Sequence, residues 1–199
     1  MKSGDASRFK SQLKFILEID KLKAIERRSF PIELDRLENS AEHSWHVALM
    51  AQIFAEYADE NVDLLRVQGM LLIHDLVEID AGDTFIYDEV GNRDKAKREC
   101  AAADRIFLIL PKDQGRELRT LWDEFESCES ADSRFAAALD RLMPLLHNFH
   151  TEGRSWRQHG IVKAQVVERN RSIVEGSQRL WEYAKDLIDE AVKLGYLKE

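Results

Sequence analysis

Apolar residues recur along most of the chain at the three- and four-residue spacing of an amphipathic helix. Between Phe9 and Ile25 they alternate in this way with Lys, Glu and Asp, which is typical of a helix with one apolar face. The same spacing predicts helices at residues 7–27, 39–57, 64–78, 93–110, 111–125, 133–150, 161–173 and 178–194. We therefore expect an all-α fold, a helical bundle of about seven to nine helices.

Polar residues with capping chemistry mark where several of these helices begin. Asn39 is followed three residues later by Glu42, an arrangement that resembles a capping box. Asp63 is expected to cap the helix over 64–78, and either Ser130 or Asp132 is expected to cap the helix over 133–150.

Some segments lack helical spacing and are predicted as loops. Pro31 ends the first helical pattern and opens a short connector. Residues 80–92 combine glycines with several acids, and residues 153–160 are polar although they contain Trp156 and His159. Both are predicted as irregular.

The composition agrees with a helical, single-domain protein. Among 199 residues there are nine glycines and three prolines, too few for the many turns of a β protein, and hydrophobic residues make up 44%, enough to form a core. We expect one domain over residues 1–199, with the candidate site in a core region at about 13–150 and the helices of 161–195 packed against it.

The net charge of −8 argues against nucleic-acid binding, because no basic stripe is present to hold a phosphate backbone. A local cluster of cations would still allow a small anionic substrate. Cys100 and Cys128 are isolated thiols, which fit neither a disulfide framework nor a cysteine metal site. Met1 to Lys10 is polar, and no run of about 18 apolar residues is present to span a bilayer. We expect a cytoplasmic protein that does not bind membranes.

The candidate chemistry begins in the second and third predicted helices. His43 lies in the first turn of the second, while His74 and Asp75 come near the end of the strongly apolar third. Imidazole nitrogen and carboxylate oxygen are donors that suit a divalent transition metal. A buried carboxylate is costly unless it is paired or bound to metal. As structural alternatives, His43 could cap its helix, and Asp75 could pair with Arg66 or Arg141.

A further buried acid is predicted at Asp140, within the apolar sequence of residues 136–143. Pro144, four residues later, has no N–H to bond the carbonyl of Asp140, and its ring crowds that carbonyl. We expect a kink that aims Asp140 inward as a fourth ligand.

Two acids follow closely behind the candidate ligands. Glu78 lies one turn after His74 and shares its helical face, so it is either a general acid or base beside the metal or a solvated carboxylate at a helix end. Asp83 follows Gly82 and either handles protons or stabilises a turn. The remaining histidines form no clear ligand set and are expected to be structural or adjacent to the site, namely His46, His147, His150 and His159.

The ordered set of His43, His74-Asp75 and Asp140 resembles the HD-domain superfamily of metal-dependent phosphohydrolases. The chain is similar to the branch that contains bacterial 5′-deoxynucleotidases through three motifs, which are Ala41-Glu42-His43-Ser44, His74-Asp75-x-x-Glu78 and Gly82-Asp83. The similarity extends from about Leu13 to the helix that contains Asp140.

This resemblance implies roles for the residues that match the family's motifs. The metal ligands are matched by His43, His74, Asp75 and Asp140. The residues that assist the attacking water and the leaving group are matched by Glu78 and Asp83. The arginine that holds the phosphate is matched by Arg27 or Arg28.

We therefore expect one divalent ion, and this donor set suits Mn, Co, Fe, Ni or Zn. The expected reaction is hydrolysis of a phosphomonoester, a nucleoside or deoxynucleoside 5′-monophosphate, and the resemblance also implies a homodimer.

Three alternatives stay open. They are another phosphoester such as a dNTP, (p)ppGpp or a cyclic nucleotide, a metal-containing dimer that binds nucleotide without catalysis, and a purely structural helical protein.

Overall fold

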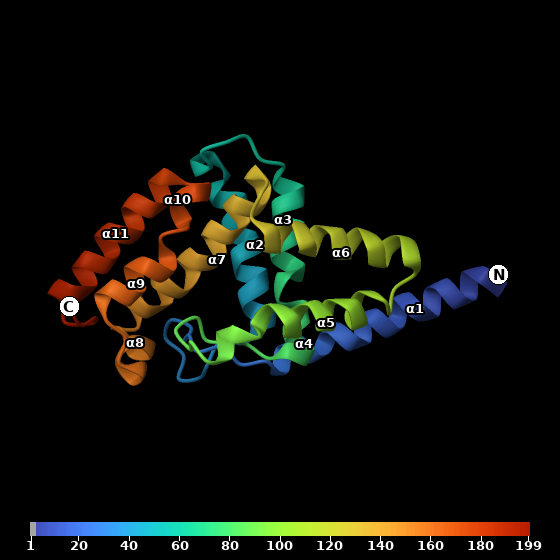
Figure 1. Ribbon diagram of the computed structural model, residues 1–199, viewed down its shortest axis with the longest axis horizontal. Coiled ribbons are helices and arrows are strands. Elements are labelled where there is room, and N and C mark those ends of the chain that lie inside the picture. Colours follow the sequence, from blue (N-terminus) through green and yellow to red (C-terminus); the bar gives the residue numbers. More distant parts are fainter. Residues whose placement is uncertain (1–2) are drawn as a thin grey trace.

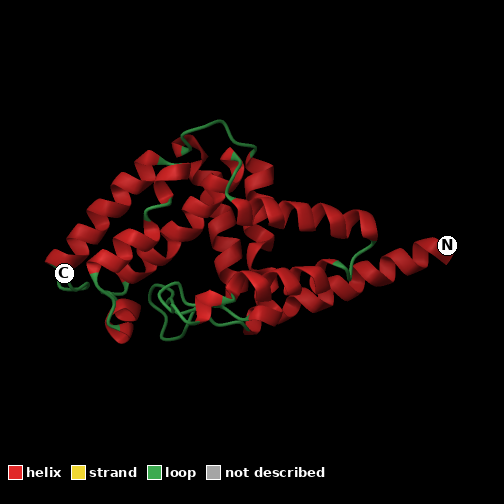
Figure 2. Cartoon of the chain, viewed as in Figure 1, coloured by secondary structure: helices red, strands yellow, loops and turns green. Residues whose placement is uncertain are grey.

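The computed structural model describes residues 3–199, and within this range the regular structure is helical and contains no strand (Figure 2). The all-α prediction is confirmed. The α-helices (Figure 1) are α1 (Ser3–Ile19), α2 (Ser40–Phe54), α3 (Leu64–Ile73), α4 (Glu78–Ala81), α5 (Lys95–Phe107), α6 (Lys112–Ser127), α7 (Ala131–His150), α8 (Arg154–His159), α9 (Lys163–Asn170), α10 (Ile173–Gly176) and α11 (Gln178–Lys193). Short 3₁₀ turns are η1 (Asp20–Ala24), η2 (Ala55–Tyr57), η3 (His74–Val77) and η4 (Gly91–Arg93).

Helix α7 lies at the centre of the fold and contacts α2, α3, α6, α8, α10 and α11 (Figure 1). Its apolar side chains join those of α2, α3 and α11 in one buried cluster. A second cluster joins α5 and η3 with Trp122 of α6, and Leu121 packs against both clusters. Residues 1 and 2 of the predicted domain lie outside the described residues, and the single-domain organisation stays a prediction.

The predicted capping chemistry at the start of α2 is present. The Asn39 side chain accepts hydrogen bonds from the backbone N–H groups of Ala41 at 3.1 Å and Glu42 at 3.0 Å, and the Glu42 carboxylate accepts from the Asn39 N–H at 2.8 Å. The side chain of Ser130, rather than that of Asp132, caps α7. These caps determine where His43 and Asp140 lie along their helices.

The first predicted helix is too long, because the α-helix ends at Ile19 and Ile25 is already extended. The backbone around Ile25 pairs instead with the segment before α2. The Arg27 N–H donates to the Glu38 carbonyl at 2.8 Å, and the Ser40 N–H donates to the Ile25 carbonyl at 3.0 Å. This pairing between distant segments competes with helix formation and brings Arg27 beside the start of α2.

The predicted helix over 64–78 is also interrupted, since α3 ends at Ile73 and the 3₁₀ turn η3 follows. Side chains bind the carbonyls at the break. His74 Nδ1 lies 2.8 Å from the Leu71 carbonyl, and the Trp122 indole donates to the His74 carbonyl at 3.2 Å. The tighter winding of a 3₁₀ turn changes the direction of successive side chains, so His74 and Asp75 both point toward the candidate site.

Residues 153–160 are not the polar loop that was predicted, because residues 154–159 form α8 and the Trp156 side chain is 1% exposed. The Asn148 side chain accepts from the Trp156 N–H at 3.3 Å, and the Asn148 carbonyl accepts from Gly153 at 2.7 Å. Gly153 and Gly160 adopt the left-handed conformation on either side. One buried tryptophan stabilises a helix whose other residues are mostly polar.

Helix α2 leaves several of its large apolar side chains exposed. Trp45 and Ile53 are each 61% exposed and Leu49 is 47% exposed, while the buried side includes Val47 and Ala51. Exposed leucines of α3 lie beside this surface, because Gln68 of α3 donates a hydrogen bond to the Ala48 carbonyl of α2. We call this surface the α2–α3 patch, consisting of Trp45, Leu49, Ile53, Leu65 and Leu72.

Within residues 3–199, no helix has both the length and the apolar character required to cross a bilayer.

Candidate metal centre and active-site cavity

His43, His74 and Asp75 converge at the inner end of α2 and at η3. One side-chain donor atom from each lies within 4.8 Å of the others, and all three residues are buried. The capping box fixes His43 in the first turn of α2, and the 3₁₀ turn presents His74 and Asp75 as neighbours. The structure therefore brings together three of the four predicted ligands in a group of the size that a single ion requires.

Asp140 joins this group from α7. Its Oδ1 lies 2.9 Å from His43 Nε2 and 3.5 Å from His74 Nε2. Helix α7 continues through Pro144, and the kink expected there stays a prediction. Burial alone would raise the pKa of Asp140, but the hydrogen bond with His43 and the nearby imidazole of His74 hold that pKa well below its usual range. Asp140 is thus negatively charged at neutral pH.

The orientation of His74 fits metal binding. Because its Nδ1 faces the Leu71 carbonyl, which can only accept, Nδ1 carries a proton, and the neutral imidazole therefore has its lone pair on Nε2. His74 Nε2 is buried and has no hydrogen-bond partner among the described residues. A buried lone pair aimed at two carboxylates is the arrangement expected of a metal ligand rather than of a core histidine.

The electrostatic field at this point favours a cation. Burial, and the charge of Arg27, would lower the pKa of His43, yet Asp140 and Glu38 raise it to about 9. For His74, Asp75 and Asp140 likewise outweigh the effect of burial and raise its pKa. A field that holds a proton on buried imidazoles also attracts a divalent ion. The residues present therefore fit such an ion.

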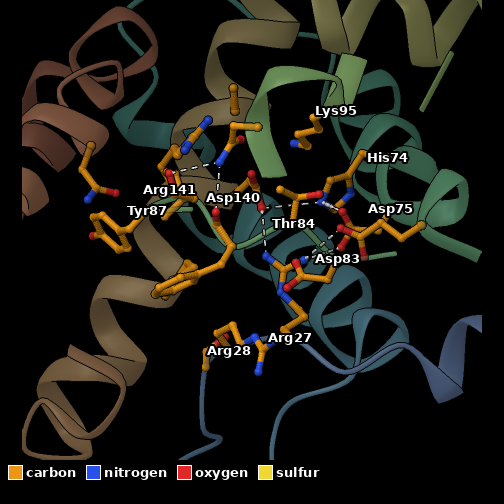
Figure 3. Close-up of a pocket in the computed structure, with 18 of the residues that line it drawn as sticks. Arg27, Arg28, His74, Asp75, Asp83, Thr84, Tyr87, Lys95, Asp140 and Arg141 are labelled. Carbon is orange, nitrogen blue, oxygen red and sulfur yellow. Dashed lines mark hydrogen bonds and ion pairs between the residues drawn. The ribbon is translucent and has the colours of Figure 1, made fainter. Parts of the chain in front are cut away.

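Of the two predicted phosphate-binding arginines, only Arg27 reaches this group. Its Nη1 donates to Asp75 at 2.7 Å and lies 4.0 Å from Glu78, and its Nη2 lies 4.0 Å from Asp140. Arg28 is exposed and lines the same cavity farther from the histidines (Figure 3). Asp75 thus pairs with Arg27 and not with Arg66 or Arg141, the partners considered from the sequence.

Glu78 is a buried acid and not the solvated one that was the structural alternative. Its Oε2 accepts a hydrogen bond from the Ser40 hydroxyl at 2.6 Å. Burial, followed by the charge of Asp75, raises the pKa of Glu78 to about 8. At neutral pH this carboxyl therefore carries a proton that it can give away, which suits a general acid.

Asp83 lines the same cavity as Glu78. Gly82 ends α4 with φ +73°, a conformation that favours glycine, and turns the chain so that Asp83 faces Arg27 and Asp75 (Figure 3). Burial raises the pKa of Asp83.

The cavity beside these residues has a volume of about 260 Å³. One side of α7 lines it from Asp140 to Asn148, while Tyr87 lies at the end opposite His74 (Figure 3). Eight residues of helix correspond to about 12 Å. The opening is therefore elongated, with the His–Asp group at one end and aromatic side chains at the other.

Sequence reasoning missed two cations of this cavity, Lys95 and Arg141 (Figure 3). Lys95 lies 3.5 Å from Glu99, and within residues 3–199 Arg141 makes no ion pair. It also missed Glu38, which is 2% exposed behind His43. In the sequence Lys95 and Glu38 look like ordinary surface charges, whereas Arg141 lies in an apolar stretch and was considered only as a partner of Asp75.

Comparison with known proteins identifies the family. The HD-domain family model matches residues 19–181. The chain belongs to the HD-domain family. This confirms the resemblance stated from the sequence motifs.

Relatives of this HD-domain chain include curated and structurally determined proteins. The human protein named 5′-deoxynucleotidase HDDC2 is 30% identical over 145 residues, which cover 72% of this chain and 69% of that protein. The zebrafish protein of the same name is 25% identical over 189 residues, covering 85% of this chain and 93% of that protein. A crystal structure from Magnetospirillum magnetotacticum, described as a predicted metal-dependent phosphohydrolase, is 55% identical, covers both chains fully and has a TM-score of 0.94.

The buried carboxyl of Glu78 predicts a pH-dependent difference in stability. Its pKa is about 8 in the folded protein and about 4.3 in an unfolded chain, so folded protein binds the proton more tightly. The free energy of unfolding therefore falls as the pH rises through this window. Glu78→Gln has no carboxyl to titrate at this position, so the variant should not lose stability in this way. In metal-free protein, the stability of the variant relative to wild type should increase by at least about 1 kcal/mol between about pH 4 and pH 9.

Urea denaturation with chelator present, repeated across this pH range, measures the difference. Glu89→Gln, which changes an exposed acid, is the control and should follow wild type. A stability difference between Glu78→Gln and wild type that stays constant with pH would contradict the assignment.

Proposed function

We propose that this HD-domain protein is a metal-dependent phosphomonoesterase that acts on deoxynucleoside 5′-monophosphates. The observation that carries the proposal is the convergence of buried His and Asp donors with an arginine and a protonated glutamate in one cavity. The proposed ligands are His43, His74, Asp75 and Asp140. The donor set suits Mn, Co, Fe, Ni or Zn.

When bound, a divalent ion would polarise the phosphoryl group and activate water for attack. Arg27 is proposed to hold the phosphate. A guanidinium has five N–H donors, and the hydrogen bond to Asp75 occupies one Nη1–H, so the other amino group remains for phosphate oxygens.

Glu78 is proposed as the general acid. Its proton is available at neutral pH because burial raises its pKa to about 8, and transfer to the leaving ester oxygen would avoid release of an alkoxide. The Ser40 hydroxyl holds one carboxyl oxygen and so leaves the other to face the cavity. Asp83 is proposed to assist in orienting water on the same side.

The shape of the cavity supports a nucleotide. The distance of about 12 Å along α7 is comparable to the length of a nucleoside monophosphate. Tyr87 lies away from the metal end of the cavity (Figure 3). Trp156 also lines the cavity, and its N–H donates to Asn148, at the end of the lining α7 segment opposite Asp140. Aromatic rings bind a nucleobase by stacking. Relatives named 5′-deoxynucleotidase support the deoxy sugar.

Phosphate release from a panel of ribo- and deoxyribonucleoside 5′-monophosphates tests this function. With added Co²⁺ or Mn²⁺ we expect release that favours deoxy substrates and stops with chelator. Glu78→Ala should reduce kcat by about 10²–10⁴-fold, while the exposed-site control Glu89→Ala should not. No release from any monophosphate by metal-loaded wild type would exclude this function and direct attention to di- or triphosphates or to binding without catalysis.

We further propose that Lys95 and Arg141 bind the substrate's anionic or polar groups. A divalent ion and Arg27 would together only offset the charges of Asp75, Asp140 and Asp83, so the two negative charges of a phosphate dianion would have no counterpart there. Additional cations lining the same cavity would offset them. Lys95 and Arg141 are the lysine and arginine that lie there beyond the Arg27–Arg28 pair.

Arg141→Gln and Lys95→Gln should each raise KM for the preferred monophosphate by about tenfold and change kcat by less than about twofold, as expected for groups that bind substrate and transition state alike. Steady-state kinetics at saturating metal measures both constants. Arg93→Gln, at an exposed cation of the neighbouring turn, should match wild type. Unchanged KM values in both cavity variants would refute the assignment.

We propose a homodimer formed through the α2–α3 patch. Large apolar side chains exposed on neighbouring helices are typical of an interface, and a second copy of the chain offers the same patch about a two-fold axis. The cytoplasmic location stays a prediction.

Sedimentation measures the oligomeric state. Wild type should sediment at twice the chain mass of 23.1 kDa, and Trp45→Glu should sediment as a monomer because a charge in an apolar interface is costly. Tyr183→Glu, at an exposed aromatic residue of α11, should leave the dimer intact. A monomeric wild type, or a dimeric Trp45→Glu, would rule out this interface.

A further inference from the structure

Glu38 is a buried carboxylate that the proposed mechanism does not use. It lies in the segment before α2 and is 2% exposed. Its Oε2 accepts a hydrogen bond from the Ser29 hydroxyl at 2.9 Å. Burying the charge of such a carboxylate costs several kcal/mol unless charged or polar neighbours compensate. The groups around Glu38 therefore indicate what its charge does.

Three nitrogen atoms surround Glu38 at the same distance. Arg27 Nε and His43 Nδ1 each lie 3.6 Å from its Oε2, and His147 Nδ1 lies 3.6 Å from its Oε1. All three nitrogens are buried, and none has a hydrogen-bond partner within residues 3–199. A distance of 3.6 Å is longer than a hydrogen bond, yet a shift of less than about 1 Å would complete each bond.

His43 and His74 must both carry a proton on Nδ1 to bind a metal ion through Nε2, but different acceptors face their Nδ1 atoms. In this structure His43 Nε2 faces Asp140 Oδ1 at 2.9 Å, which requires a proton between them. For Nε2 to offer a lone pair to a metal ion, that proton must be absent and a neutral imidazole must carry its proton on Nδ1. His74 satisfies the same requirement through the Leu71 carbonyl at 2.8 Å. For His43 the acceptor facing Nδ1 is the Glu38 carboxylate.

We propose that Glu38 is a positioning residue that holds the proton of His43 on Nδ1, turns Nε2 toward the metal, and aligns Arg27 through Nε. One carboxylate thereby orients a metal ligand and the phosphate-binding arginine together. Carboxylate groups behind metal-binding histidines commonly fix the ring and its tautomer in this way. The proposal rests on the proposed metal site but not on the identity of the substrate.

Zinc binding provides the first test. Zn²⁺ affinity, measured by competition with a chelating dye, should fall about 10–100-fold in Glu38→Gln, because the amide keeps the size of the side chain and loses its charge. Glu33→Gln changes an exposed glutamate of the same connector and should bind Zn²⁺ like wild type. Glu38→Asp, which keeps the charge, should recover part of the lost affinity. Affinity of Glu38→Gln within about twofold of wild type would overturn the proposal.

The tautomer of His43 provides a second test that needs no variant at position 38. In ¹⁵N-labelled, Zn²⁺-loaded wild type, long-range ¹H–¹⁵N spectra should show the proton on Nδ1 and the metal-bound type of nitrogen at Nε2, with His43→Gln assigning the signals. A proton on Nε2 would overturn the proposal, even if Glu38→Gln fails to fold. Failure of wild type to bind Zn²⁺ would instead overturn the metal site itself, and the role of Glu38 with it.

The kinetic consequence separates positioning from a general structural role. KM for the monophosphate is measured at Zn²⁺ or Co²⁺ concentrations that saturate Glu38→Gln. It should still exceed the wild-type KM by about threefold or more, because Arg27 has lost the carboxylate that faces its Nε. Ser29→Ala, which removes the hydroxyl donor but leaves the carboxylate, should have a smaller effect on both KM and Zn²⁺ affinity. Equal effects of the two variants would contradict the assigned role.

Discussion

Negative charge removed from water is the physical constraint on which this structure depends. Glu38, Asp75 and Glu78 are almost fully buried, and the charge of each is costly in a low-dielectric interior unless it is compensated. Arg27 approaches all of them, at 3.6 Å from Glu38, 2.7 Å from Asp75 and 4.0 Å from Glu78. One guanidinium cannot balance so many carboxylates. The negative charge that Arg27 leaves uncompensated favours a proton on Glu78 and a divalent cation between the histidines.

The fold meets this constraint by interrupting helices where the charges converge. The α-helical winding of α3 stops at Ile73 and continues as a 3₁₀ turn, so that His74 and Asp75 project toward α2. The first helix stops at Ile19, and the chain then pairs with the segment before α2, which brings Arg27 and Glu38 to the same place. Helix α7 contributes Asp140 from the centre of the bundle. These interruptions of regular helix cost stability, but they bring the charged side chains of the candidate site together.

The cavity beside the histidines also contains both buried carboxylates and cations, whose charges must balance. In the proposed function, a phosphate group next to Asp75 and Asp140 needs more positive charge than Arg27 supplies, and cations along the elongated opening would provide it. Behind the histidines, the balance depends on Glu38, whose charge is buried on the side away from substrate. The proposed substrate and metal sites therefore share one connected set of charges, although no single element of the fold contains them.

Local sequence information determined much of this protein. Helical periodicity predicted the all-α fold, and the polar residues Asn39 and Asp63 correctly located helix starts, because capping involves atoms only two or three residues apart. The ordered motif containing His43, His74 and Asp75 identified the family, since the donor types and their spacing are visible in one dimension.

Tertiary structure decided what depends on distant partners. The burial of Trp156 and the exposure of Trp45 reversed what polarity and spacing suggested, because each depends on which helix packs alongside. The choice of Arg27 over Arg28 follows from backbone pairing between residues 25–40 that no local pattern encodes. Glu38 looks like a surface charge in the sequence, and only the folded chain shows that it is buried. A sequence records which groups are present, but the dielectric environment and the neighbours that determine their chemistry arise only when the helices pack.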